Sequence, residues 1–246
     1  MWKKISIKKL INFIIDILFP RFCFGCQKEG VYLCKDCLST IDISEYQYCL
    51  CKKPQRVLQN QLSLRKEGKC PRCRSRKLNG LFFAVSYDNL LVKNLIQKFK
   101  YKPFIKDLAE PLSLLIINHF KLLNNTLNFS DFILVPIPLT KRKLKWRGFN
   151  QSEEIAKRIS EFLKVPLYAD ILIKIKETLP QVNLKEKERE KNIENAFFVR
   201  NRDIVSGRKI LLVDDIYTTG STMEESAKVL KNAKTKEVWG VTVARE

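Results

Sequence analysis

The stretch 209–223, KILLVDDIYTTGSTM, decides how the rest of this chain is interpreted. Its residues 210–213 are consecutively apolar, a pattern that favours a strand buried on both faces. Two carboxylates, Asp214 and Asp215, follow where such a strand would end. Ligands bind beyond the carboxyl ends of strands in open α/β sheets. We therefore predict an α/β fold with a mainly parallel sheet and a ligand site at these acids.

A small, hydroxyl-rich turn follows the acids, and the apolar spacing from Met223 onward predicts a helix behind it. Backbone N–H groups at a helix N-terminus favour anions, and Gly220 permits close approach of a ligand to the backbone. The turn is not a Walker loop, because the Gly-Lys-Ser/Thr ending is missing. The residues that we predict to bind phosphate are Thr218, Thr219, Gly220, Ser221 and Thr222.

Paired acids beside a phosphate site suit a ribose 5-phosphate, because carboxylates accept hydrogen bonds from the 2- and 3-hydroxyls. They also suit Mg²⁺ and favour the positive charge that develops at the anomeric carbon. The predicted ligand is phosphoribosyl pyrophosphate with Mg²⁺, and Asp214 and Asp215 are the candidate catalytic residues. The run resembles the signature of the type I phosphoribosyltransferases, which implies a Rossmann-like domain. An ordinary turn that caps a helix is the alternative.

The composition is strongly basic. The 246 residues include 46 Lys and Arg against 26 Asp and Glu, a net charge of +20. Such a charge suggests a polyanionic partner, such as nucleic acid, an anionic membrane surface or a phosphorylated ligand. A general lysine bias across the chain explains the excess equally well.

All eight cysteines precede residue 74, and most of them form C-x2-C pairs. Thiolates two residues apart bind one Zn²⁺ from a tight turn, and two pairs complete its tetrahedron. Disulfides are the alternative, but the first residues do not form a signal peptide, which argues for a reducing compartment. The simplest allocation is one zinc on Cys23, Cys26, Cys34 and Cys37 and a second on Cys49, Cys51, Cys70 and Cys73, with an interleaved arrangement as the alternative.

This asymmetry predicts two domains, a small cysteine-rich zinc module over residues 1–79 and a phosphoribosyltransferase-like domain over residues 80–246. The first nineteen residues have the spacing of an amphipathic helix. We expect it to dock on its own protein, with peripheral contact to an anionic membrane as the alternative. No run is long and apolar enough for a transmembrane segment. We expect a cytoplasmic protein, and we assign no role to the lone histidine, His119.

A second apolar run, residues 132–135, ends in prolines and is followed by a cluster of cations around Trp146. These cations could receive the pyrophosphate of the ligand, or they could bind a nucleic-acid backbone while Trp146 or Phe149 stacks on a base. A solvated loop is the third interpretation. The candidates for pyrophosphate or DNA binding are Pro138, Lys141, Arg142, Lys143, Lys145 and Arg147.

Three stretches together resemble the ComF family of phosphoribosyltransferase-like proteins: VPIPLTKRKLKWRGFNQS, the charged segment from Thr178, and LLVDDIYTTGST. The cysteine-rich start, LFPRFCFGC and LCKDC, is also similar to that family. The resemblance spans nearly the whole chain. It implies a type I phosphoribosyltransferase domain behind a zinc finger, in the cytoplasm, that acts with DNA-uptake proteins of natural competence on incoming single-stranded DNA.

The resemblance also implies roles by motif position. Asp214 and Asp215 would bind ribose and Mg²⁺, residues 218–222 the 5-phosphate, and residues 138–142 would form the pyrophosphate loop. A flexible loop would contain Thr178, Gln181, Arg189 and Asn192. The chain departs from the family at two places, with Lys174 or Lys176 where an arginine is usual and with the one-residue spacer between Cys49 and Cys51.

Two functions remain open at this point. The first is a protein that binds phosphoribosyl pyrophosphate and Mg²⁺ and supports processing of imported DNA, with pentosyl transfer implied by the family. If it transfers the phosphoribosyl group, a nitrogen nucleophile displaces pyrophosphate, and rate comes from positioning and charge stabilisation. The alternative is a non-catalytic module that senses a phosphorylated metabolite or binds single-stranded nucleic acid.

Overall fold

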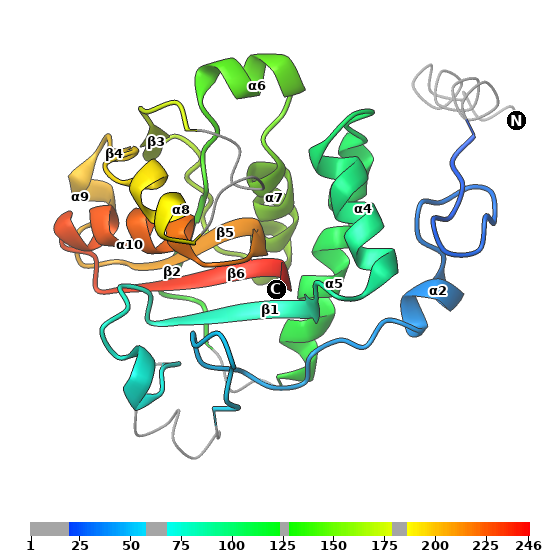
Figure 1. Ribbon diagram of the computed structural model, residues 1–246, viewed down its shortest axis with the longest axis horizontal. Coiled ribbons are helices and arrows are strands. Elements are labelled where there is room, and N and C mark those ends of the chain that lie inside the picture. Colours follow the sequence, from blue (N-terminus) through cyan, green and yellow to red (C-terminus); the bar gives the residue numbers. More distant parts are fainter. Residues whose placement is uncertain (1–19, 58–67, 124–127, 179–185) are drawn as a thin grey trace, which may run out of the picture. The chain divides into compact units, whose positions relative to one another are not determined.

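A computed structural model describes residues 20–57, 68–123, 128–178 and 186–246 (Figure 1). The chain divides into two compact units, one that ends at Asp42 and one that extends from Ile43 to Glu246. The second cysteine group therefore belongs to the same compact unit as the sheet. The division into functional domains at residues 79 and 80 stays a prediction. The predicted N-terminal helix lies outside the described residues.

The smaller unit is held by tight turns around its cysteines. Phe22 and Glu29 form an isolated antiparallel bridge, and the backbone N–H of Cys23 donates to the carbonyl of Lys28 at 2.9 Å. Cys34 caps the short helix α2 (Lys35–Ser39), because its Sγ accepts from the backbone N–H of Cys37 at 3.4 Å. A turn and a capped helix thus supply the cysteines of this unit.

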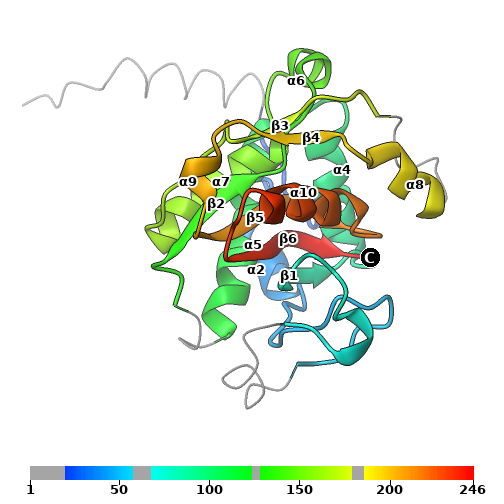
Figure 2. The same cartoon turned by 90° about the vertical axis from the view of Figure 1, so that its left-hand side faces the viewer.

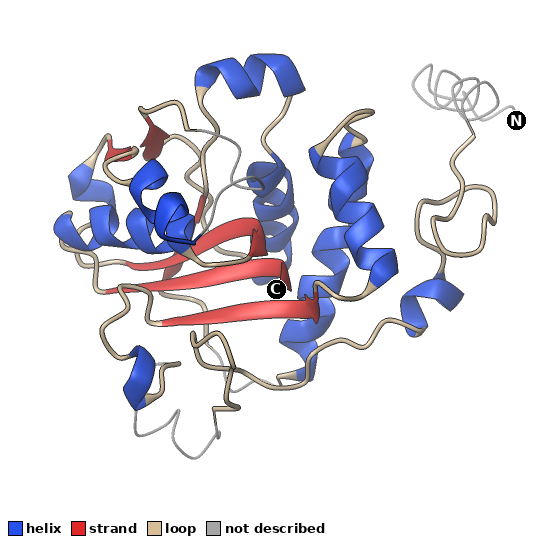
Figure 3. Ribbon diagram, in the orientation of Figure 1, coloured by secondary structure: helices blue, strands red, loops and turns tan. Residues whose placement is uncertain are grey.

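A four-stranded parallel sheet forms the centre of the larger unit, in the order β1-β6-β5-β2 (Figure 3). Its strands are β1 (Gly80–Ser86), β6 (Glu237–Arg245), β5 (Lys209–Tyr217) and β2 (Phe132–Pro136). A separate antiparallel pair consists of β3 (Leu172–Lys174) and β4 (Phe197–Val199). The predicted α/β fold with a mainly parallel sheet is confirmed.

Helices flank this sheet on both faces. The longer ones are α4 (Leu90–Lys100), α5 (Ala109–Leu122), α7 (Gln151–Leu163) and α10 (Ser221–Asn232). The shorter ones are η1 (Pro71–Cys73), η2 (Lys106–Leu108), α6 (Lys141–Arg147), α8 (Glu186–Ile193) and α9 (Arg202–Val205). The β3-β4 pair and α8 lie beside α10 (Figure 2).

The sheet is buried because its strands are apolar on both faces. Ile210 and Leu212 pack in one core cluster with residues of α10, whereas α5 and α7 contact the sheet without joining that cluster. Since side chains alternate along a strand, α10 covers one face and α5 and α7 cover the other. Phe82 stacks on Trp239 with ring centroids 5.3 Å apart, and Gly80 is required there because a Cβ would lie 2.3 Å from the Trp239 ring.

His119 is a packed residue of this core. It is 1 % exposed, and its Nδ1 lies 2.6 Å from the carbonyl oxygen of Ser44. Burial lowers the pKa of His119 to about 4. A neutral, buried imidazole on a backbone carbonyl is a structural group, in agreement with the absence of an assigned role.

The structure differs from one sequence-based interpretation, the solvated loop after the prolines. The cationic segment 141–147 is a helix, because Thr140 caps its start and Gly148, with φ 85°, ends it. Between α7 and β3, Leu167 forms an isolated bridge to Leu134. The 3-10 turn η2 continues directly into α5.

Candidate functional site

Asp214 and Asp215 lie within β5 rather than beyond its end, which corrects the expected position. β2 pairs with β5 only as far as Val213, where the backbone N–H of Ile137 donates to the Val213 carbonyl at 2.9 Å. From Asp214 to Tyr217, β5 is paired with β6 alone. The two acids therefore lie in the part of β5 that pairs with only one neighbouring strand. Side chains from other elements can approach the strand there.

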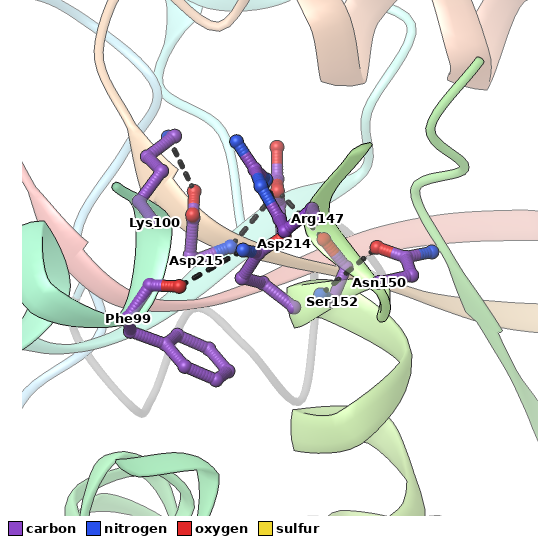
Figure 4. A network of polar contacts seen from close by, with 8 residues as sticks. Phe99, Lys100, Arg147, Asn150, Ser152, Asp214 and Asp215 are labelled. Carbon is purple, nitrogen blue, oxygen red and sulfur yellow. Dashed lines mark hydrogen bonds and ion pairs between the residues drawn. The ribbon is translucent and has the colours of Figure 1, made fainter. Parts of the chain in front are cut away.

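Two residues from distant parts of the chain contact the acids directly (Figure 4). Lys100, the last residue of α4, forms an ion pair from its Nζ to Asp215 Oδ1 at 2.9 Å. Ser152, in the first turn of α7, donates from its Oγ to Asp214 Oδ1 at 2.9 Å. The backbone N–H of Asp215 also donates to Asp214 Oδ1 at 2.9 Å. Both carboxylates are thus held in fixed positions before any ligand binds.

The segment 147–152, RGFNQS, lies beside the two acids and contacts Asp214 through Ser152. Asn150 caps α7 by accepting from the N–H of Ser152 at 3.2 Å, and its Nδ2 donates to the Ile137 carbonyl at 3.0 Å. Gln151 donates from Nε2 to the Phe99 carbonyl at 2.9 Å and accepts from Nη1 of Arg147. This segment therefore fixes Ser152 and Arg147 relative to the end of α4.

Charge states at the site reflect burial and the close approach of like charges. Burial and the charge of Asp215 raise the pKa of Asp214 to about 7, against the opposing effect of Lys100. Burial acts to lower the pKa of Lys100, but Asp215 and Asp214 outweigh it and raise the pKa. Burial and the charge of Lys143 lower the pKa of Lys174 to about 8. The charges of the two acids and of the neighbouring lysines therefore shift one another's pKa values.

Helix α6 divides the predicted cations into two groups. Lys143 and Arg147, one helical turn apart, are half-buried, and burial lowers the pKa of each. The charges of Asp215 and Asp214 act on Arg147, and Lys143 Nζ donates to the Thr178 carbonyl at 3.4 Å. The other candidates on α6 are exposed, namely Lys141, Arg142 and Lys145. Pro138, before the helix, is half-buried.

The two aromatic candidates for base stacking differ in exposure. Trp146 is 57 % exposed and meets the Phe104 ring edge-on, with centroids 4.7 Å apart. Phe149 is buried, with its ring centroid 5.4 Å from that of Phe99. Phe149 therefore belongs to the core, which corrects its candidacy, and Trp146 is the aromatic of this segment that faces solvent.

The predicted phosphate turn joins β5 to α10 as expected. Thr219 Oγ1 and Ser221 Oγ are 2.8 Å apart, and the N–H of Ser221 points to Thr219 Oγ1 at 3.4 Å. Gly220 caps the helix in a left-handed conformation, φ 79°. A Cβ at Gly220 would lie 2.3 Å from Tyr217 Oη, so both the conformation and the space require glycine. Thr218 and Thr222 are half-buried in the same turn.

The predicted flexible loop is described only in part. Thr178 is buried, and Gln181 lies outside the described residues. Arg189 and Asn192 lie on α8, so the second half of this segment is a helix. Of the two lysines that replace the family's arginine, Lys174 interacts with Asp214, whereas Lys176 reaches the Glu194 carbonyl at 3.5 Å. Of these two lysines, Lys174 is therefore the one that contributes its charge to the candidate site.

The cysteines form two groups, Cys23, Cys26, Cys34 and Cys37, and Cys49, Cys51, Cys70 and Cys73. Within each group the sulfur atoms lie within 4.8 Å of one another. Zn–S bonds of about 2.3 Å in a tetrahedron separate sulfurs by about 3.8 Å, so either group could bind zinc. The cysteines are grouped sequentially, as the simplest allocation predicted, and the one-residue spacer between Cys49 and Cys51 does not prevent the second group from closing.

Backbone N–H groups also point at these sulfurs, which favours thiolates. The N–H of Gln55 donates to Cys49 Sγ at 3.2 Å, and that of Cys34 to Cys23 Sγ at 3.3 Å. Burial acts to raise the pKa of Cys23, but the backbone hydrogen bonds outweigh it and bring the pKa to about 6, whereas the side-chain hydrogen bond with Cys34 raises the pKa of Cys37 to about 12. Thiolates are the form that binds a metal.

Sequence reasoning did not assign a site role to Lys100, Gln151 or Ser152. Lys100 and Asp215 are 115 positions apart, so no local spacing links them. Gln151 and Ser152 were part of a recognised motif, and their burial as polar residues in the first turn of a helix is the signal that could have singled them out. No helix among the described residues has the length and apolar character needed to cross a membrane.

Comparisons with known proteins agree with this geometry. Residues 147–246 match the phosphoribosyl transferase domain family. The chain is 34 % identical over 114 residues to Competence protein F of Haemophilus influenzae, covering 45 % of this chain and 50 % of that protein. It is 35 % identical over 108 residues to DNA utilization protein YhgH of Escherichia coli, covering 43 % and 47 %. The chain thus spans about half the length of these two relatives.

A more distant relative matches along almost the whole chain. Competence protein ComFC of Bacillus subtilis is 27 % identical over 258 residues, covering 98 % of this chain and 97 % of that protein. That alignment includes the cysteine-rich segments as well as the sheet. The parallel sheet, the two acids on β5, the domain match over residues 147–246 and these relatives together support a phosphoribosyltransferase-like protein of the ComF family.

Proposed function

We propose that this protein binds phosphoribosyl pyrophosphate with Mg²⁺ and supports the processing of incoming single-stranded DNA during natural competence. The observation that carries the proposal is the convergence of cations on the two acids of β5 beside a hydroxyl-rich turn at a helix N-terminus. Lys143, Arg147 and Lys174 are partly desolvated like charges held close together. Such an arrangement favours a ligand that carries several negative charges.

Each part of the ligand has a complementary group. The turn 218–222 would bind the 5-phosphate through backbone N–H groups and hydroxyls. Asp214 and Asp215 would accept the ribose hydroxyls and share Mg²⁺ with the pyrophosphate, because carboxylate oxygens suit this hard cation. The three cations would bind the pyrophosphate, with Arg147 able to bind two of its oxygens at once.

Pentosyl transfer would add a nitrogen nucleophile that displaces pyrophosphate at the anomeric carbon. In that case Asp214 and Asp215 would stabilise the positive charge that develops on the sugar, and the cations would stabilise the leaving pyrophosphate. The competence role and a location in the cytoplasm rest on the resemblance to the competence proteins, and DNA-uptake proteins are the expected partners.

Calorimetric titration with phosphoribosyl pyrophosphate and Mg²⁺ tests the ligand. We expect Asp214→Ala combined with Asp215→Ala to weaken binding at least about 100-fold, since two charge-assisted contacts are lost. Asp203→Ala, an exposed acid on α9, is the matched control and should bind as the wild type does. Equal binding by the wild type and the double variant would refute the site. Release of pyrophosphate on addition of nitrogen bases would establish transfer.

A second candidate function is binding of single-stranded nucleic acid without a reaction at the acids. The exposed face of α6 favours it, because Trp146 stands there among Lys141, Arg142 and Lys145. Cations that bind the backbone and an aromatic ring that stacks on a base are the usual combination for single strands. The two functions use different faces of one helix and are compatible in one protein.

A further inference from the structure

The second cysteine group is joined to the end of the sheet by one arginine. Arg245, the last residue of β6, donates through Nη1 to the carbonyl oxygen of Cys49 at 2.7 Å and through Nη2 to that of Cys51. The arginine is 5 % exposed. The planar guanidinium can make both hydrogen bonds only when the carbonyls of Cys49 and Cys51 are at fixed positions. Those positions depend on the conformation of the cysteine turn.

The same arginine supports the phosphate turn through Tyr217. Tyr217 is the register partner of Arg245 on the neighbouring strand, and the guanidinium lies 5.5 Å from its ring centroid. The ring is 3 % exposed and lies directly against Gly220, where a Cβ would meet its hydroxyl at 2.3 Å. Within the described chain Tyr217 Oη has no hydrogen-bond partner, so packing and the contact with the Arg245 guanidinium hold the ring against the turn.

A second contact connects the cysteine segment to the first turn of α10. Glu224 Oε2 accepts from the backbone N–H of Lys77, four residues after Cys73, at 2.6 Å. Asn79 continues this link, because its Oδ1 accepts from the N–H of Val238 on β6 at 2.9 Å. Cys49 and Cys73 also belong to the core cluster that contains Met223 of α10. The cysteine segment is therefore linked to the start of the phosphate turn through Arg245 and Tyr217, and to the first turn of α10 behind it through Glu224.

We propose that a metal ion on Cys49, Cys51, Cys70 and Cys73 positions the phosphate turn 218–222, so that occupancy of this metal site sets the affinity for the phosphorylated ligand. The proposal deepens the proposed function and rests on it for the identity of the ligand. Cross-linking by the metal fixes the two carbonyls that Arg245 requires. The phosphate turn binds its ligand more tightly when its hydrogen-bond donors are ordered before binding. Disorder of these donors lowers the affinity.

The other cysteine group supplies an internal control. Cys23, Cys26, Cys34 and Cys37 lie in the separate compact unit that ends at Asp42. A metal on that group should not affect the phosphate turn. The coupling must also be reciprocal, because a ligand that binds the ordered turn more tightly stabilises the metal-loaded state by the same factor.

The first test is hydrogen–deuterium exchange in the full-length protein without ligand. We expect Cys51→Ser combined with Cys70→Ser to raise the exchange rates of amides 216–224 at least about 10-fold, and Cys26→Ser combined with Cys37→Ser to leave them unchanged. Arg245→Met keeps every cysteine and should give the same local increase with the zinc content unaltered. Unchanged exchange in Arg245→Met would overturn the proposal even if the double cysteine variant unfolds.

The second test measures ligand affinity with phosphoribosyl pyrophosphate and Mg²⁺ as the probe. Arg245→Met should weaken binding about 10- to 100-fold, the usual effect of losing a residue that supports a site from behind, and Arg200→Met, an exposed arginine, should not. No binding by the wild-type protein would refute the proposed ligand, and the exchange experiment would still decide the coupling. Wild-type affinity in Arg245→Met would refute the coupling and leave the proposed function standing.

Discussion

Asp214 has a pKa of about 7 in the folded protein, against about 3.9 in an unfolded chain. Burial and Asp215 disfavour its ionised form, so the unfolded chain releases this proton first as pH rises. The stability that this group contributes is therefore present below about pH 4 and lost as pH rises through about 7. We expect Asp214→Asn to raise the free energy of unfolding at pH 8 by about 1–3 kcal/mol and to change it little at pH 4.

Urea denaturation at the two pH values measures this difference. Asp203→Asn, on the exposed surface of α9, serves as the control and should behave as the wild type at both. An equal change at pH 4 and pH 8 would contradict a raised pKa for Asp214. Mg²⁺ should also bind more tightly as pH rises and Asp214 loses its proton, since only the ionised carboxylate is a metal ligand.

Lys100 neutralises Asp215, which is 4 % exposed. Removal of the cation would leave a buried carboxylate without a partner, so we expect Lys100→Met to lower the free energy of unfolding by about 2 kcal/mol. Asp215→Asn in the same chain should recover much of that loss, with a coupling energy of about 1–3 kcal/mol in a double-mutant cycle. Lys102→Met, two residues along and exposed, is the control. A coupling energy near zero would show that the ion pair does not stabilise the fold.

At the scale of elements, local patterns predicted what depends on neighbours in the sequence. The apolar run of β5, the two acids and the turn before α10 are contiguous, and the structure has them in that order. The side chains that complete the site are not local, since Lys100 and Arg245 reach partners 115 and 196 positions away. Apolar periodicity did not predict the helix α6, because most of its residues are basic. Its capping residues, Thr140 and Gly148, are the sequence signals that indicate where it begins and ends.

Helix α6 presents two faces with different predicted ligands. We expect Lys141→Gln, Lys145→Gln and Trp146→Ala together to weaken binding of single-stranded DNA about 10-fold, because a stacking partner and two phosphate contacts are lost from the exposed face. Fluorescence anisotropy with a labelled oligothymidine measures this effect, and binding by the wild type should weaken as salt is raised. Affinity for phosphoribosyl pyrophosphate should stay within about twofold of the wild type, since Lys143 and Arg147 are retained.

Arg158→Gln combined with Arg202→Gln removes two exposed cations, from α7 and α9, and is the matched control for charge alone. If it weakens DNA binding as much as the triple variant does, the net charge of +20 rather than the face of α6 accounts for binding. An unchanged affinity in the triple variant would place the DNA surface elsewhere in the chain.

At the scale of the whole molecule, the two compact units separate after Asp42, and each cysteine group lies within a single unit. A unit with its own internal contacts is expected to fold by itself. We therefore expect a protein that begins at Ile43 to retain a cooperative thermal transition within about 3 °C of the full-length midpoint, since the sheet and its core are all present. Circular dichroism measures the transition, and zinc analysis should give one ion per chain instead of two.

Full-length protein with Cys26→Ser and Cys37→Ser provides the comparison, because it loses the first metal site without loss of chain. The shortened protein and this variant should share both the zinc content and the transition. Loss of the cooperative transition only in the shortened protein would mean that residues before Ile43 stabilise the sheet. Retention of phosphoribosyl pyrophosphate binding in both would assign the whole ligand site, with the metal group behind it, to residues 43–246.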